Sequence, residues 1–380
     1  MIYADYNGSA PLCPDVREHV IKRIQEGPFA NPNAIHHLGT KVLMAMENSR
    51  SVCAKVLGAD FKQVLFNSGA TEGITQAFFS IMHKNPKKKI IISGIEHSAV
   101  VNCAKFYMKD FGHEMVVLKT NDNGVVDLED LKDHIDNNTA MVAVMAANNE
   151  TGIIQPYREI AEICNTNDVP YLCDTTQYIG KTLFDFKKSG IDYAVMSGHK
   201  IGAMTGCGLL IAKDPTTVKE LVIGGGQENG KRGGTQNYLA YETLAVALHY
   251  FETHLDKLEV LNTKRVEFES RIKEKFPDVV IIGENSPRLS STTYISYPGI
   301  HGQAVQIELE SKGIYVTTSS ACSDNEPVTS KVLKAMNVTD DVGRGVVRIS
   351  LGMCSDPAYY DEIFEALSNS YDKLSKIKSY

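Results

Sequence analysis

Lys200 is the residue of this sequence that is best placed for covalent chemistry. The apolar segment 192–196 predicts a short strand, and the turn Ser197-Gly198-His199 brings Lys200 to the end of that strand. A lysine on a rigid turn can form a Schiff base with an aldehyde cofactor if burial keeps enough of its amine neutral. An isolated lysine in this position is usually an ordinary surface residue, so the interpretation depends on its surroundings.

Polar side chains follow other predicted strands in the same way. In an open parallel sheet the carboxyl ends of the strands meet along one edge, where ligands bind. The polar groups expected at that edge are Ser68-Gly69-Ala70-Thr71, His97, Asn148-Asn149, Asp174 with Gln177, and Ser197 to Lys200. We therefore expect one ligand site to which several distant segments contribute.

Each of these groups has a chemical and a structural interpretation. Segment 68–71 opens a helix after a strand, which suits either a phosphate at the positive end of the helix or an ordinary helix cap. Asp174 ends an apolar strand, so its carboxylate needs a partner: a protonated pyridine nitrogen, an arginine or a backbone amide. Gln177 is within reach of a ring hydroxyl, and His97 could lie over a planar ring and transfer protons. With Lys200, these residues meet the requirements of a pyridoxal 5'-phosphate enzyme.

The segments that must position these residues alternate between strands and helices. The predicted strands are 63–67, 89–93, 114–118, 140–146, 169–173, 192–196 and 207–212, and the helices between them include 71–83, 98–111, 127–135 and 157–166. Such alternation predicts an α/β fold with a mostly parallel sheet covered by helices on both faces. From about residue 240 the pattern changes to a smaller α+β part, with strands 278–282, 291–297, 313–317 and 345–351 and helices 302–312 and 328–336.

Composition excludes several other classes of protein. The 380 residues are 43% hydrophobic and 22% charged, which is typical of a globular protein that is large enough for two domains. The net charge is −7 and no long basic run occurs, so nucleic-acid binding is not expected. No signal peptide or membrane span is expected, because no basic N-terminal region or long apolar segment is found. The eight cysteines are scattered without a C-x-x-C pair, which favours a reducing cytoplasm over a disulfide framework or a zinc site.

The motifs carry a resemblance to a known family. The order of Thr71, His97, Asn149, Asp174, Gln177 and Lys200 resembles the fold type I pyridoxal-phosphate enzymes. The class V aminotransferase branch, and its cysteine desulfurases in particular, resemble the chain at Ser68-Gly-Ala-Thr-Glu72, Glu96-His97, Asn148-Asn-Glu-Thr-Gly152, Ser197-Gly-His-Lys200 and Gly233-Gly-Thr235. The segments Ser319-Ser-Ala-Cys322-Ser323 and Val347-Arg348-Ile-Ser-Leu-Gly352 resemble the group I desulfurases, which carry a nucleophilic cysteine on a long loop. The resemblance covers nearly the whole chain.

This resemblance implies a role for each matching residue. It implies that Lys200 forms the Schiff base, that Asp174 binds the ring nitrogen, that Gln177 binds the ring hydroxyl and that His97 stacks on the ring as an acid or base. It implies that the phosphate is held by Ala70, Thr71, Ser197 and His199, and by Thr235 of a neighbouring subunit in a homodimer. It implies that Asn149 and Arg348 bind the substrate carboxylate, Arg348 as a bidentate fork.

The resemblance also implies the reaction and its partners. Cys322 would attack the sulfur of L-cysteine, leaving L-alanine and a persulfide that passes to a sulfur-acceptor protein, for iron–sulfur cluster assembly or for thiolation of tRNA or a cofactor. Residues 14–255 are expected to form the large cofactor-binding domain. Residues 1–13 and 256–380 would form the small domain, with the Cys322 loop at about 317–330. The expected compartment is the cytoplasm.

Cys322 also has an interpretation that does not depend on the family. Most single cysteines are buried and inert, but the residues around this one are polar and typical of a loop, which suits an exposed thiol for sulfur transfer. Asp324 and Glu326 should raise its pKa, so we expect the thiolate to form only when the loop enters the site. The loop lacks a glycine found in the family pattern and gains Asp324, and the opening Asp5-Tyr-Asn-Gly-Ser-Ala-Pro11 also departs from that pattern.

Three other functions compete with a cysteine desulfurase: a nucleotide-binding protein, an aminotransferase and a selenocysteine lyase. Gly225-x4-Gly230-Lys231 nearly matches a nucleotide-binding P-loop, but Arg232 stands where Ser or Thr should meet magnesium. An aminotransferase would have no need of Cys322. A selenocysteine lyase is harder to separate from a cysteine desulfurase on sequence, because selenium is the easier atom to remove.

Overall fold

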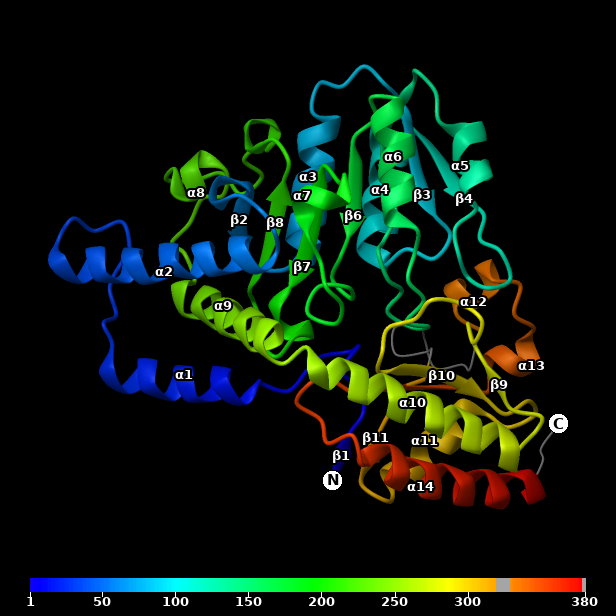
Figure 1. Cartoon of the computed structure of the whole chain (residues 1–380). Coiled ribbons are helices and arrows are strands. Elements are labelled where there is room, and N and C mark those ends of the chain that lie inside the picture. The colour runs from blue at the N-terminus through cyan, green and yellow to red at the C-terminus, as the bar shows by residue number, and fades with distance from the viewer. Residues whose placement is uncertain (319–328, 378–380) are drawn as a thin grey trace.

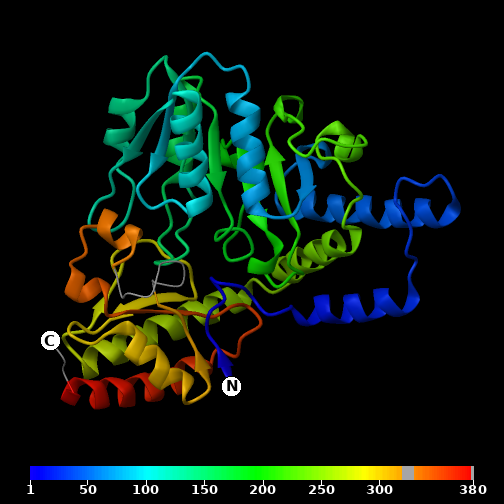
Figure 2. The same ribbon diagram turned by 180° about the vertical axis from the view of Figure 1, so that it is seen from behind.

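The computed structural model describes residues 1–318 and 329–377. Cys322 and most of the predicted loop around it lie outside these residues. Figures 1 and 2 show a large sheet with helices on both faces, next to a smaller group of strands and helices that contains the N-terminal strand and the last helix. Within the described ranges, no helix combines the length and apolar character needed to cross a membrane.

The large sheet has seven strands and is mostly parallel, as predicted. Its order is β2-β8-β7-β6-β5-β3-β4, and only β8 runs antiparallel to its neighbours. The strands are β2 (Val64–Asn67), β3 (Lys89–Ser93), β4 (Glu114–Leu118), β5 (Thr139–Ala143), β6 (Tyr171–Asp174), β7 (Tyr193–Ser197) and β8 (Gly208–Ala212). All but the edge strand β4 are buried along their length and mostly apolar, because both faces of the sheet are covered.

Two groups of helices cover the two faces of this sheet. Ile90 and Ile92 of β3 face one apolar cluster and Ile91 faces the other, as the two-residue period of a strand requires. The first cluster includes α3 (Ala70–Met82) and α4 (Ser98–Phe111). The second includes α2 (His37–Val56), α5 (Leu128–His134), α6 (Tyr157–Thr166) and α9 (Tyr238–Thr253). The remaining helices of this part are α1 (Pro14–Glu26), which packs against α9, and the short α7 (Phe186–Ser189) and α8 (Gln227–Gly230).

The smaller part has a separate apolar cluster. Its strands are β1 (Ile2–Tyr3), which pairs in parallel with β11 (Ile314–Tyr315), and the antiparallel set β9 (Val280–Ile281), β10 (Thr292–Ser296) and β12 (Val346–Ser350). Its helices are α10 (Asp256–Lys275), α11 (Gly302–Glu310), α12 (Lys331–Ala335), α13 (Asp340–Gly343) and α14 (Tyr359–Leu374). Ile2 and Ala4 join this cluster, so the first strand lies with the C-terminal third of the chain.

Some elements are shorter in the structure than the sequence pattern predicts. The strand expected over 140–146 ends at Ala143, because the backbone N–H of Met145 donates to the Glu96 side chain instead of to β3. The helix expected over 328–336 begins at Lys331, where the Ser330 hydroxyl accepts a hydrogen bond from the N–H of Leu333 and caps it.

Candidate active site

The carboxyl ends of the strands bring most of the predicted residues to one edge of the large sheet. Asp174 is the last residue of β6 and Ser197 the last residue of β7. Lys200 ends a single 3₁₀ turn, Gly198–Lys200, that directly follows β7. The predicted placement of the lysine on a short turn after a strand is therefore confirmed.

The turn before α3 has the features of an anion site. The backbone N–H of Ala70 donates to the Ser197 hydroxyl at 2.8 Å, which ties the start of α3 to the end of β7. Gly69 has a φ of +150°, a conformation that side chains disfavour, and a Cβ there would lie 3.2 Å from the Ser197 hydroxyl oxygen. Thr71 lies exposed in the first turn of this 13-residue helix. The positive end of α3 and these hydroxyl groups together suit a phosphate.

His199 lies beside this turn as a neutral side chain. Its Nδ1 is 3.1 Å from the Ser9 hydroxyl. Burial, together with the charges of Lys200 and Lys181, lowers the pKa of His199 to about 4. At neutral pH it can therefore bind an anion by hydrogen bonding but not by charge.

Asp174 is a buried carboxylate without a cationic partner in the part of the chain that the structure describes. It is 7% exposed, and its Oδ1 accepts a hydrogen bond from the N–H of Thr176 at 3.0 Å. Among the described residues it forms no ion pair, and the buried hydroxyl of Thr176 has no hydrogen-bond partner. A buried carboxylate is costly unless a cation or strong donors compensate it. A protonated pyridine nitrogen meets that need, so this residue and the anion site fit pyridoxal 5'-phosphate.

Glu96 is a second buried carboxyl group near Asp174, and the sequence indicated it only as part of a motif. Its Oε1 accepts hydrogen bonds from the Ser93 hydroxyl at 2.5 Å and the Met145 N–H at 2.9 Å, while Oε2 has no partner within the described residues. Burial raises the pKa of Glu96 to about 8, and the charge of Asp174 adds to this effect. Glu96 therefore stays largely protonated at neutral pH.

The N-terminal segment supplies two hydrogen-bond acceptors to Lys200. The Lys200 amine donates to the carbonyl oxygens of Asn7 at 2.9 Å and Gly8 at 2.7 Å. The Nε2 of Gln177 donates to the same Asn7 carbonyl at 2.9 Å, so Gln177 and Lys200 meet at one atom. Sequence reasoning did not assign a role to Asn7; the only signal was its place in the unusual opening 5–11.

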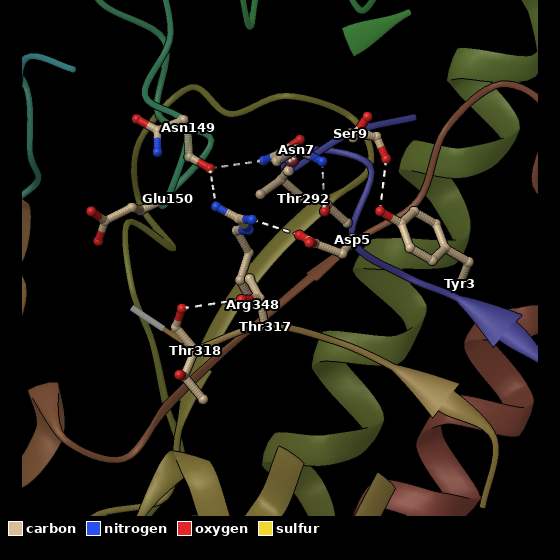
Figure 3. A network of polar contacts seen from close by, with 12 residues as sticks. Tyr3, Asp5, Asn7, Ser9, Asn149, Glu150, Thr292, Thr317, Thr318 and Arg348 are labelled. Atoms are coloured by element: carbon tan, nitrogen blue, oxygen red, sulfur yellow. Dashed lines mark hydrogen bonds and ion pairs between the residues drawn. The ribbon is translucent and has the colours of Figure 1, made fainter. Parts of the chain in front are cut away.

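Arg348 is held in a network that joins three distant segments (Figure 3). Its Nη2 donates to Oδ1 of Asp5 at 2.6 Å and its Nη1 to the carbonyl oxygen of Asn149 at 2.8 Å. Its Nε is buried and has no partner among the described residues. Asn149 contacts Arg348 through its main chain, while its side-chain amide points away from it (Figure 3). The Nε–H is thus a buried donor that is left for a further acceptor, and Nη1 and Nη2 each carry a second N–H.

Two of the described residues that were predicted for the site, His97 and Thr235, are not brought into these contacts. His97 caps α4, where its Nδ1 accepts a hydrogen bond from the N–H of Ala99 at 3.2 Å, and its ring is exposed. Thr235 is exposed in the segment before α9. Cys322 lies outside the described residues.

Comparisons with known proteins match the whole chain. The sequence profile of the family described as aminotransferase class-V matches residues 2–359. A cysteine desulfurase IscS of Dictyoglomus turgidum is 32% identical over 384 residues, covering 100% of this chain and 96% of that protein. A cysteine desulfurase IscS of Rickettsia typhi is 33% identical, covering 99% of this chain and 92% of that protein.

Solved structures give the same result. A NifS-like protein superposes with a TM-score of 0.90 at 31% identity, covering 98% of this chain and 100% of the other. A structure described as SspA in complex with cysteine superposes with a TM-score of 0.81 at 29% identity, covering 92% of this chain and 99% of the other.

The fold and the site, with a lysine after β7 and a buried carboxylate after β6, are those of a fold type I enzyme that depends on pyridoxal 5'-phosphate. The chain belongs to the aminotransferase class-V family and, within it, to the IscS- and NifS-type cysteine desulfurases.

Proposed function

We propose that this chain removes sulfur from L-cysteine, yields L-alanine and carries the sulfur as a persulfide on Cys322. The observation that supports this most strongly is the buried Asp174, which has no cationic protein partner in the described ranges and lies on the same sheet edge as Lys200. Such a carboxylate suits a cationic ring, and the adjacent lysine suits covalent attachment of that ring.

Two sets of residues would hold the cofactor, one at its ring and one at its phosphate. Asp174 would pair with the ring nitrogen, Gln177 would donate to the ring hydroxyl and Lys200 would bind covalently. The phosphate would be bound by a separate set: Ala70, Thr71, Ser197 and His199, with Thr235 of the partner subunit. When bound, pyridoxal 5'-phosphate withdraws electrons from the substrate α-carbon and makes its bonds labile.

Arg348 and Asn149 would bind and orient the substrate carboxylate. The buried Nε of Arg348 supports this role, because a buried N–H without an acceptor is costly and a carboxylate oxygen would satisfy it. Asp5 accepts one N–H of Nη2, and the second N–H of that nitrogen can donate to the substrate carboxylate.

His97 would transfer protons through its Nε2. Its Nδ1 accepts the N–H of Ala99 and therefore carries no proton in this arrangement, which leaves Nε2 as the nitrogen that exchanges protons. The ring is exposed at the sheet edge, where both substrate and loop could reach it.

Cys322 would act as the nucleophile. Its thiolate attacks the sulfur of L-cysteine, an S–S bond forms, and the C–S bond breaks with its electron pair left on carbon. A proton delivered to that carbon gives L-alanine, and the enzyme keeps the sulfur as a persulfide.

We also propose that the enzyme is a homodimer. Helices α1 and α2 project from the body of the subunit (Figures 1 and 2) and expose apolar side chains, including those of Ile21, Ile24, Leu38 and Met44. Such apolar groups are typical of surfaces that bind another protein. The exposed Thr235 is then available to a neighbouring subunit.

The sulfur would pass to an acceptor protein in the cytoplasm, either an iron–sulfur scaffold or a protein that thiolates tRNA or a cofactor. The proposed domains are residues 14–255 for the cofactor and residues 1–13 with 256–380 for the smaller domain that carries the Cys322 loop.

A single-turnover experiment tests the proposed reaction. L-cysteine is added to the cofactor-loaded enzyme without reductant, alanine is quantified and the protein is digested for mass spectrometry. We expect about one alanine per active site and one added sulfur atom on the Cys322 peptide. Alanine with the added sulfur on another cysteine would contradict the assigned nucleophile.

A further inference from the structure

Lys181 is a buried lysine beside the cofactor site that the proposed reaction does not use. It lies in the turn after β6 and is 8% exposed. The turn depends on Gly180, which has a φ of +77° and where a Cβ would come within 2.2 Å of the Ile201 side chain. The position of Lys181 next to Lys200 is therefore fixed by the close packing of two turns.

The Lys181 amine is bound by amides and not by a carboxylate. It donates to Oδ1 of Asn7 at 2.7 Å and to Oε1 of Gln177 at 2.5 Å. In the described part of the chain it forms no ion pair. Burial lowers the pKa of Lys181 well below its ordinary value, and the charges of Lys200 and Arg348 act in the same direction, while Asp5 opposes them.

These two hydrogen bonds determine how both amides are oriented. The oxygens of Gln177 and Asn7 accept from the Lys181 amine, so their NH₂ groups point away from it. The Gln177 NH₂ group then meets the Asn7 carbonyl at 2.9 Å, and the Asn7 NH₂ group meets the Asn149 carbonyl at 3.2 Å and the Thr292 hydroxyl at 3.1 Å.

The oriented amides lead directly to the groups that handle the cofactor. The Asn7 carbonyl accepts hydrogen bonds from both Gln177 and Lys200. Gln177 uses one N–H for that carbonyl, which leaves its second N–H for another acceptor. Without Lys181, the Gln177 amide could rotate and present its oxygen where a donor is needed.

We propose that Lys181 is a positioning residue of the cofactor site, which fixes the Gln177 amide so that an N–H faces the cofactor and places a second amine beside Lys200. This inference rests on the proposed function, because it takes the acceptor of the second Gln177 N–H to be the ring hydroxyl oxygen. A lysine that only filled space would need neither acceptor.

The test compares the parent with Lys181→Met, which keeps the length of the side chain and removes its donors. The visible absorption band of the bound cofactor is titrated with pH, and the dissociation constant of pyridoxal 5'-phosphate is measured by dialysis. Losing the Gln177 hydrogen bond to the ring hydroxyl oxygen disfavours loss of the proton from the cofactor chromophore. We expect the midpoint to rise by roughly half to one pH unit, and the dissociation constant by roughly 3- to 10-fold. The charged and titratable groups around this amine are Lys200, His199, Arg348 and Asp5.

A double-mutant cycle separates positioning from a general structural role. If Lys181 acts through Gln177, the Gln177→Ala/Lys181→Met protein should bind the cofactor about as well as Gln177→Ala alone. Fully additive losses, or an unchanged midpoint in Lys181→Met, would overturn the inference. Lys181→Gln keeps a hydrogen-bonding side chain, so its titration midpoint should rise by less than that of Lys181→Met. This variant replaces Lys181→Met if the methionine variant does not fold. A parent protein without a visible band would instead contradict the proposed function.

Discussion

Replacing Arg348 by methionine tests how the substrate carboxylate is bound. Of the three guanidinium nitrogens, Nη1 is bonded to the Asn149 carbonyl and Nη2 to Asp5, while Nε is buried without a protein acceptor in the described residues. A substrate carboxylate therefore gains at least the charge-assisted hydrogen bond from Nε, and Nη2 has a second N–H beside the one that Asp5 accepts. One such bond contributes about 1.5 to 3 kcal/mol, which corresponds to roughly 10- to 150-fold in binding.

The assay compares L-cysteine with L-cysteine methyl ester, which lacks the carboxylate charge. In Arg348→Met we expect the KM for L-cysteine to rise roughly 10- to 150-fold while the KM for the ester changes little. The Asp5→Asn/Arg348→Met protein is the control, because it removes the carboxylate that the single variant leaves without its cation. Equal losses for both substrates would refute the reasoning, since they would show that Arg348 supports the fold and not the substrate carboxylate.

Three further predictions follow from buried and exposed groups. The pKa of Glu96 rises from 4.5 to about 8 on folding, so between these pH values the native state binds one proton that the unfolded state does not. The free energy of unfolding should therefore fall as the pH rises through this window, by up to about 5 kcal/mol. Chemical unfolding as a function of pH should show that Glu96→Gln loses this slope; an unchanged slope would assign it elsewhere. Interaction with the Cys13 thiol lowers the pKa of the exposed Cys354 to about 7, so the rate at which iodoacetamide alkylates Cys354 should be half-maximal near pH 7. Cys13→Ala should move that midpoint to higher pH, as followed by peptide mass spectrometry. An unchanged midpoint would exclude the interaction between the two thiols. If the partner's Thr235 completes the phosphate site, a mixed dimer of one Thr235→Ala subunit and one Lys200→Ala subunit should contain one intact site and one site with both changes. The intact site combines Lys200 of the first subunit with Thr235 of the second. This mixed dimer should bind cofactor as tightly as the parent at that site, whereas weak binding there would place Thr235 in its own subunit's site.

The sequence was sufficient for the parts of the site that depend on strand ends. The apolar segments 192–196 and 169–173 are short and bounded by turn residues, so the positions of Lys200 and Asp174 at one sheet edge follow from the alternation of strands and helices. The turn at Gly69 follows for the same reason, because the strand before it and the helix after it are both strongly patterned.

The contacts made by the N-terminal segment could not be predicted in this way. Asn7 lies 170 residues from Gln177 and 193 from Lys200, and no local pattern indicates which distant groups a turn residue will meet. The pairing of Asp5 with Arg348 depends on β12 lying beside residues 4–6, which is set by tertiary packing. The neutral state of Glu96 likewise depends on burial that its polar neighbours in the sequence do not indicate.

The most direct test of the central proposal is sulfide release from L-cysteine by the cofactor-loaded protein in the presence of a reductant, measured beside a Cys322→Ser variant and with L-selenocysteine as the competing substrate. We expect the parent to release sulfide with an equal amount of alanine, and the Cys322→Ser variant to keep the bound cofactor and release no sulfide. A yellow parent that forms no sulfide from L-cysteine but cleaves L-selenocysteine, or a variant as active as the parent, would contradict the proposed function.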